Sequence, residues 1–88
     1  MGWWVYALSG DVRDYIYVGL TTDLERRVGQ HNSGKERTTK AYRPFSLLFT
    51  EEFKTRAAAR GGEKHLKSGH GKDFLRRMRR ERLKNNSE

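Results

Sequence analysis

Residues 17–32, YVGLTTDLERRVGQHN, pass from the end of a β-strand directly into a short helix. Thr22 and Glu25 stand three residues apart at the start of this helix, which is the capping-box pattern with Thr22 as N-cap and Glu25 at the third helical position. The helix is expected to run to about His31 and to stop at the Asn-Ser-Gly of residues 32–34. The stretch therefore predicts a strand that turns at once into a helix.

This helix places two polar side chains beside an apolar stripe. Leu24 and Val28 form the stripe, while Arg27 and His31 are four residues apart and project together. Tyr17 lies just ahead of the helix. Packing alone does not require a tyrosine, an arginine and a histidine at one turn, whereas chemistry on a phosphate can use all three.

The chain ahead of this unit predicts a β-hairpin. Residues 3–8 and 15–19 are aromatic and β-branched runs, and the Ser-Gly-Asp of residues 9–11 between them is turn chemistry. If the aliphatic residues of both strands face the core, strand alternation sends Tyr6 and Tyr17 to the opposite face. These two tyrosines are then neighbours on one side of the sheet.

A third strand is expected over residues 45–53, with Phe45, Leu47 and Phe49 facing inward. A second helix is expected over residues 55–67, and a third, short helix is marked by an apolar cluster that ends at Met78. The fold class is thus a small α/β (α+β) domain, a three-stranded antiparallel sheet flanked by helices. Its expected extent is residues 1–78, followed by a charged, frayed tail over residues 79–88.

Composition limits the classes of protein that remain. The chain has 88 residues, 34% of them hydrophobic, which suits one domain with a modest core. It has no cysteine, so neither disulfides nor thiolate metal sites are available. No apolar run approaches a membrane span and no signal-peptide pattern opens the chain, so a cytoplasmic protein is expected.

The net charge of +8 is unevenly distributed. Residues 1–53 are neutral overall, whereas residues 54–84 carry +9. A one-sided basic half favours a polyanion such as nucleic acid, because neutralising phosphates releases condensed counterions. A solubilising tail is the alternative, and a membrane surface is disfavoured because the basic segments lack a broad apolar face.

Glu63 fits a purely structural role least well. Helical spacing puts it on the face of the second helix that also carries Ala59 and Leu66, where an unpaired carboxylate is costly. Two interpretations remain open on this basis. Glu63 forms an ion pair with Arg60 or Lys67, or it binds a cation.

Five positions in order resemble the GIY-YIG nucleases. Residues 4–6, WVY, and residues 17–19, YVG, are similar to the paired triplets of that family, although tryptophan and valine replace its first glycine and isoleucine. Arg27 matches the catalytic arginine, His31 matches a histidine of many members, and Glu63 matches the metal-binding glutamate. Residues 31–49 also resemble the small bacterial single-domain branch and the related structure-specific junction nucleases.

The resemblance implies hydrolysis of DNA phosphodiester bonds with one divalent cation, Mg²⁺ or Mn²⁺, in a reaction of the DNA repair or recombination type. It implies that Tyr6 activates the attacking water, that Tyr17 orients the water or a phosphate oxygen, and that Arg27 stabilises the charge built up on phosphorus. His31 would bond Tyr6 or the phosphate, so either Tyr6 or His31 is the base. Glu63 would hold the cation.

Six exposed cations are the expected contacts to the DNA backbone, with little sequence specificity: Lys40, Arg43, Arg56, Arg60, Lys64 and Lys67. Two alternatives to an independent endonuclease remain open. One is a non-catalytic nucleic-acid-binding module that keeps the fold and charge. The other is a nuclease subunit that depends on a protein partner for targeting.

Overall fold

The computed structural model describes residues 2–85 and contains one three-stranded sheet and three α-helices. In chain order the elements are β1 (Trp3–Gly10), β2 (Ile16–Thr21), α1 (Leu24–Asn32), the 3₁₀ turn η1 (Lys40–Tyr42), β3 (Phe45–Phe53), α2 (Arg56–Lys67) and α3 (Gly69–Asn85). The strands are antiparallel in the order β2-β1-β3. The expected fold class is confirmed.

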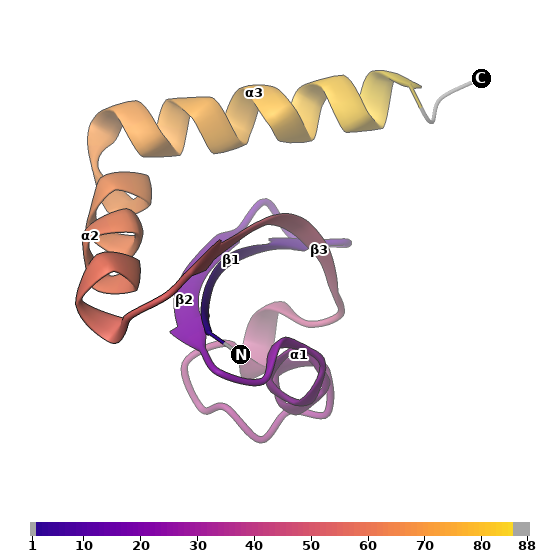
Figure 1. The fold of residues 1–88 in the computed structure, drawn as a ribbon. Helices are drawn as coiled ribbons and strands as arrows, with labels where there is room; N and C mark the ends of the chain where they lie inside the picture. The colour runs from indigo at the N-terminus through magenta and orange to yellow at the C-terminus, as the bar shows by residue number, and fades with distance from the viewer. Residues whose placement is uncertain (1, 86–88) are drawn as a thin grey trace.

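Both faces of the sheet are covered, because β1 is apolar on both sides. Val5 and Ala7 pack with residues of α2 and α3, whereas Tyr6 and Leu8 pack with residues of α1. The sheet curls around α1, and α2 and α3 lie against its outer side (Figure 1). The expected placement of Tyr6 and Tyr17 on one side of the sheet is confirmed, with their ring centroids 6.2 Å apart.

Strand β3 does not keep a simple alternation. Ala7 pairs with Phe49 but Leu8 pairs with Leu47, so Leu48 is the extra residue of a β-bulge. Before the bulge Phe45 and Leu47 face α1, and after it Phe49 packs with the core under α2 and α3. The expectation that Phe45, Leu47 and Phe49 share one inward face is therefore wrong.

Helix α1 is capped one residue later than the capping-box pattern indicates. Its N-cap is Asp23, whose carboxylate accepts a hydrogen bond from the Arg26 amide at 3.2 Å. The Asp23 amide in turn donates to the Thr21 hydroxyl at 3.1 Å, while Thr22 is exposed. The predicted Thr22–Glu25 box is wrong because a carboxylate held by a preceding threonine is the better cap here.

Helix α2 begins as expected, with the Thr55 hydroxyl accepting a hydrogen bond from the Ala58 amide at 3.1 Å. Helix α3 is longer than expected, since it begins at Gly69 and continues to Asn85. The Arg79 guanidinium contacts the Asp14 carboxylate, and Arg82 donates to the Leu47 carbonyl at 2.8 Å. These long-range contacts hold the segment that we expected to fray; residues 86–88 lie outside the described residues. No helix within residues 2–85 is long and apolar enough to cross a membrane.

Candidate active site

Tyr6 is the centre of the site, at a fully buried position of the middle strand. Its hydroxyl lies 2.9 Å from Nε2 of His31. Gly19 pairs with Tyr6 across β1 and β2, and a Cβ at Gly19 would lie 2.6 Å from the Tyr6 hydroxyl. The glycine of the YVG triplet is therefore needed to make room for the tyrosine of the WVY triplet.

His31 continues the chain of hydrogen bonds. Its side chain is buried, and Nδ1 lies 2.8 Å from the hydroxyl of Thr39, which is also fully buried. A neutral imidazole has one N–H donor and one acceptor nitrogen. When Nδ1 donates a hydrogen bond to the Thr39 hydroxyl, Nε2 accepts a hydrogen bond from the Tyr6 hydroxyl. The three residues then form one continuous chain of hydrogen bonds, which we call the proton path.

Burial governs the titration of this path. It raises the pKa of Tyr6 to about 12, with the neighbouring Tyr17 adding to the effect and the Arg27 guanidinium opposing it. Burial also lowers the pKa of His31 below its ordinary value, and the positive charge of Arg27 acts in the same direction. Both groups are consequently neutral at neutral pH, with His31 in the form that can accept a proton.

Tyr17 and Arg27 flank this path. The Tyr17 ring centroid lies 4.7 Å from that of His31. The half-buried Arg27 guanidinium donates to Gln30 Oε1 at 3.0 Å and forms an ion pair with the Glu36 carboxylate. The hydrogen bond from Arg27 to Glu36 holds the pKa of the Glu36 carboxyl below its usual range. The Arg27 guanidinium, which the resemblance assigns to a phosphate, is therefore paired with the Glu36 carboxylate in this structure.

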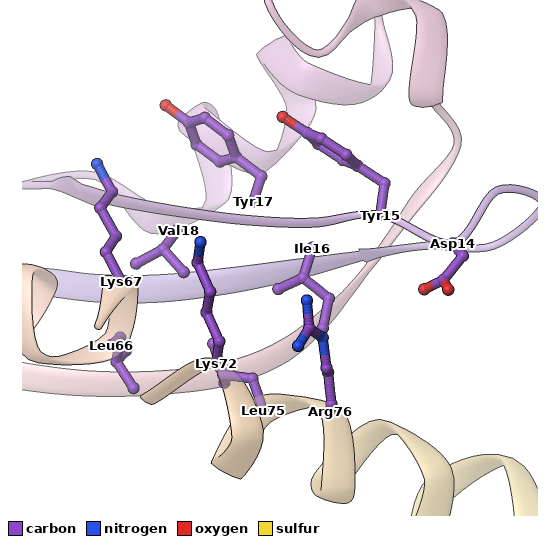
Figure 2. Close-up of a pocket in the computed structure, with 10 residues that line it drawn as sticks. All are labelled: Asp14, Tyr15, Ile16, Tyr17, Val18, Leu66, Lys67, Lys72, Leu75 and Arg76. Carbon is purple, nitrogen blue, oxygen red and sulfur yellow. The ribbon is translucent and has the colours of Figure 1, made fainter. Parts of the chain in front are cut away.

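Glu63 comes from the other side of the sheet, on α2. Its side chain is 18% exposed, and the Nζ atom of Lys67 lies 3.2 Å from its carboxylate. Of the two ion pairs considered from the sequence, the structure contains the one with Lys67. Lys67 and Tyr17 line the same cleft at the β2 edge (Figure 2). Glu63 is therefore close to that edge, one helical turn from Lys67, but it is bonded to Lys67 and not to the α1-side residues.

The donor set around Glu63 fits a magnesium-type ion better than a transition metal. Among the described residues, no group of three or more histidine, cysteine or acidic side chains is arranged to hold a metal. Mg²⁺ commonly binds through one or two carboxylates and completes its shell with waters and substrate phosphates. The single carboxylate of Glu63, which is 18% exposed, is compatible with that mode.

The six predicted DNA-backbone contacts are all exposed but do not form one cluster. Four lie along α2, and the other two, Lys40 and Arg43, lie on the connection between α1 and β3. Within the α2 group, the Arg56 guanidinium lies over the Trp3 ring at 5.6 Å from its centroid. The structure therefore separates these cations into two groups.

Two residues that shape the site, Glu36 and Thr39, were not predicted from the sequence, and Gly19 was recognised only as part of the YVG triplet. The pairing of Tyr6 with Gly19 follows from the hairpin register and could have been found from the strand pattern. Thr39 and Glu36 lie in a polar connection without periodicity, so nothing in the sequence distinguishes them. Their position depends on Asn32, whose amide side chain accepts from the Phe45 amide at 2.7 Å and donates to the Phe45 carbonyl at 3.2 Å, closing this connection.

The match to known proteins agrees with this geometry. A family model described as GIY-YIG catalytic domain matches residues 2–79. The chain therefore belongs to the GIY-YIG family, a family of nuclease domains, and the resemblance seen in the sequence is confirmed.

Within that family the chain is similar to UPF0213 proteins. One from Natronomonas pharaonis is 37% identical over 81 residues, which cover 91% of this chain and 87% of that protein. UPF0213 protein YazA of Bacillus subtilis is 44% identical over 52 residues, 58% of this chain and 52% of that protein. The solution NMR structure of a UPF0213 protein from Bacillus halodurans superposes with a TM-score of 0.51 at 35% identity, covering 85% of this chain and 82% of that one.

Proposed function

We propose that this chain is a divalent-metal-dependent endonuclease that hydrolyses phosphodiester bonds of DNA, with branched or flapped DNA as the preferred substrate. The observation that carries the proposal is the buried path from Tyr6 through His31 to Thr39, with the Arg27 guanidinium beside it. The path places a neutral histidine in hydrogen-bond contact with the tyrosine hydroxyl, beside a guanidinium. Hydrolysis of a phosphodiester needs a proton acceptor next to a cation that binds the phosphate.

The path resolves the difficulty that a tyrosine with a raised pKa is a weak base. Water gives its proton to the Tyr6 oxygen while the phenol proton passes to Nε2 of His31, so Tyr6 never has to ionise on its own. The water oxygen bonds to phosphorus, the bond from phosphorus to the leaving oxygen breaks, and solvent protonates that oxygen. His31 becomes an imidazolium whose Nδ1 proton remains bonded to Thr39.

The other residues bind and orient. Arg27 offers its guanidinium to the non-bridging phosphate oxygens, for which its planar donor geometry is suited. Tyr17 orients the water or a phosphate oxygen from beside His31. Glu63 would hold the divalent cation, which when bound neutralises charge on the leaving oxygen.

Substrate must first displace Glu36. Tyr6 has no exposed surface in this structure, and Arg27 is held by Glu36 beside the tyrosine. A phosphate that replaces the Glu36 carboxylate on Arg27 would open a route for water to the Tyr6 hydroxyl. The structure described here is then the resting state of the enzyme.

Cleavage of a panel of labelled linear, nicked, flapped and branched DNAs tests the proposal, with Mg²⁺, Mn²⁺ or EDTA. We expect metal-dependent cutting by the wild-type protein and a loss of about 10²–10⁴-fold in single-turnover rate for Tyr6→Phe, with DNA binding intact. Binding without cutting on every substrate with either metal would overturn the proposal in favour of a non-catalytic module, unless an added protein partner restores cutting.

The metal arm has its own test. Glu63→Gln should abolish detectable Mg²⁺ binding in calorimetry with DNA present and abolish cutting, while DNA affinity changes by only a few-fold. Lys67→Ala is the matched control, because it removes the ion-pair partner and leaves the carboxylate. Unchanged metal binding in Glu63→Gln would make Glu63 a structural ion-pair residue only.

A further inference from the structure

A cleft of about 390 Å³ lies between the edge of β2 and the corner formed by α2 and α3. Its floor is apolar and is made by four residues from the sheet and both helices: Ile16, Val18, Leu66 and Leu75. Leu75 and Leu66 are almost completely buried, so the floor is part of the packed core and is preformed. The volume is at the small end of the range of ligand clefts, about 300–1,000 Å³.

Three cations form the rim of this cleft. Lys67 from α2 and Lys72 and Arg76 from α3 extend from the helices toward β2, as Figure 2 shows. All three are exposed, and Arg76 forms a long ion pair of 4.0 Å with Asp73. Asp14 is the one acidic residue of the lining, and its carboxylate is already paired with Arg79. The rim is therefore positive overall.

The cleft borders the candidate active site at two points. Tyr17 lines the cleft, and its ring also packs against His31. Lys67 lines the cleft and is also the ion-pair partner of Glu63. The cleft and the candidate active site therefore share the β2 edge.

We infer that this cleft binds one unpaired nucleotide of the DNA strand next to the scissile phosphate. The apolar floor takes the base and sugar, and Lys72 and Arg76 bind the phosphate that follows. An apolar floor with a cationic rim matches the amphipathic character of a single-stranded nucleotide. The inference rests on the proposed function for its DNA substrate and assigns the site for the flanking strand.

Binding of a short single-stranded oligodeoxynucleotide in EDTA tests the inference without any cleavage. We compare Lys72→Ala/Arg76→Ala with Arg77→Ala/Arg80→Ala, a control that removes two charges from the same helix at residues that do not line the cleft. The first variant should weaken binding about tenfold and lower the slope of log affinity against log salt by about 0.7, because both cations bind one phosphate and a single strand contributes about 0.7 per phosphate contact. The control should change the slope by less than half that amount.

Methyl chemical shifts of the wild-type protein give a second readout on titration with the same oligonucleotide. The methyl groups of Ile16, Val18, Leu66 and Leu75 should shift, whereas those of Val12 and Leu83, which lie outside the cleft, should stay in place. Equal losses in the two double variants, unmoved floor methyls, or binding of anionic vesicles in place of the oligonucleotide would each overturn the inference. Both measurements report on binding and do not require cleavage. A failure of this inference can therefore be distinguished from a failure of the proposed endonuclease function.

Discussion

At the scale of single residues, Thr39 has the most specific expected effect, because its hydroxyl is the hydrogen-bond partner of His31 Nδ1. Thr39→Val should keep the side-chain volume but leave Nδ1 of the buried imidazole without its partner, so the cleavage rate should fall and its pH profile should shift. Thr39→Ser should restore both. Rates measured between pH 5.5 and 9 check this. An equal loss in both variants with an unchanged pH profile would mean that Thr39 acts only by packing.

Glu36 should behave in the opposite way. Glu36→Gln removes the carboxylate that pairs with Arg27 and should strengthen DNA binding several-fold, since the phosphate no longer competes with a charge. Affinity measured by fluorescence anisotropy in EDTA checks this, with Glu25→Gln on the exposed side of α1 as the control for removal of one negative charge. Weaker binding in Glu36→Gln alone would show that Glu36 holds Arg27 ready for substrate and does not block it.

The lowered pKa of His31 makes stability depend on pH. His31 binds a proton less readily in the folded state than in the unfolded state. Its contribution to the free energy of unfolding should therefore be fully present above about pH 6.5 and should decrease as the pH falls below that value. Urea unfolding at pH 7.5 and 5.5 measures the change. His31→Gln should lose part of this dependence, and an identical pH response in both proteins would contradict a buried neutral histidine.

Residue identities were the most predictable part of the site. Tyr6, Tyr17, Arg27 and His31 come together as the spacing indicates, because one hairpin and one helix carry all four. Their second partners could not be predicted in this way. Arg27 and His31 contact the connection between α1 and β3. The course of this connection cannot be predicted from sequence periodicity.

At the scale of elements, the errors share one cause. Each depends on contacts that a local sequence pattern does not contain. The bulge in β3 and the length of α3 depend on neighbouring elements, and the cap of α1 depends on which of two adjacent polar side chains binds the helix N-terminus. Ser68 separates α2 from α3, and Gly71 lies in the first turns of α3, where a Cβ would lie 2.2 Å from the His65 carbonyl oxygen. This glycine permits the close approach of α3 to α2, while the helix continues through it.

Two glycine substitutions should therefore have opposite effects. Gly61→Ala places a Cβ in open space on α2 and should stabilise the protein by up to about 1 kcal/mol through helix propensity. Gly71→Ala forces the backbones of α2 and α3 apart and should be destabilising by more than that gain. Thermal unfolding followed by circular dichroism distinguishes the two. Equal stabilisation by both would show that the corner between the helices is loosely packed.

At the scale of the whole molecule, the sheet separates the two groups of candidate site residues. The proton path and Arg27 lie on the side covered by α1, while Glu63 and the basic residues of α2 lie on the side covered by α2 and α3. The charge follows this division, since the first 53 residues are neutral and residues 54–84 carry the net positive charge. The proposed catalytic residues Tyr6, Tyr17, Arg27 and His31 thus come from the first half of the chain. The proposed metal ligand Glu63 and four of the six proposed backbone contacts come from the second half.

This division predicts that DNA affinity falls steeply with salt and that residues 54–84 are responsible for the effect. With about four to six phosphate contacts, affinity for duplex DNA should fall by about 10²–10³-fold between 50 and 200 mM salt. Lys64→Ala on α2 should lower the slope of log affinity against log salt by about 0.9, whereas Arg13→Ala on the hairpin turn should leave it unchanged. Both residues are exposed, and each substitution removes one positive charge, so net charge alone would give equal effects. Equal effects would therefore show that the charge of this protein attracts DNA as a whole and that α2 has no defined phosphate contacts.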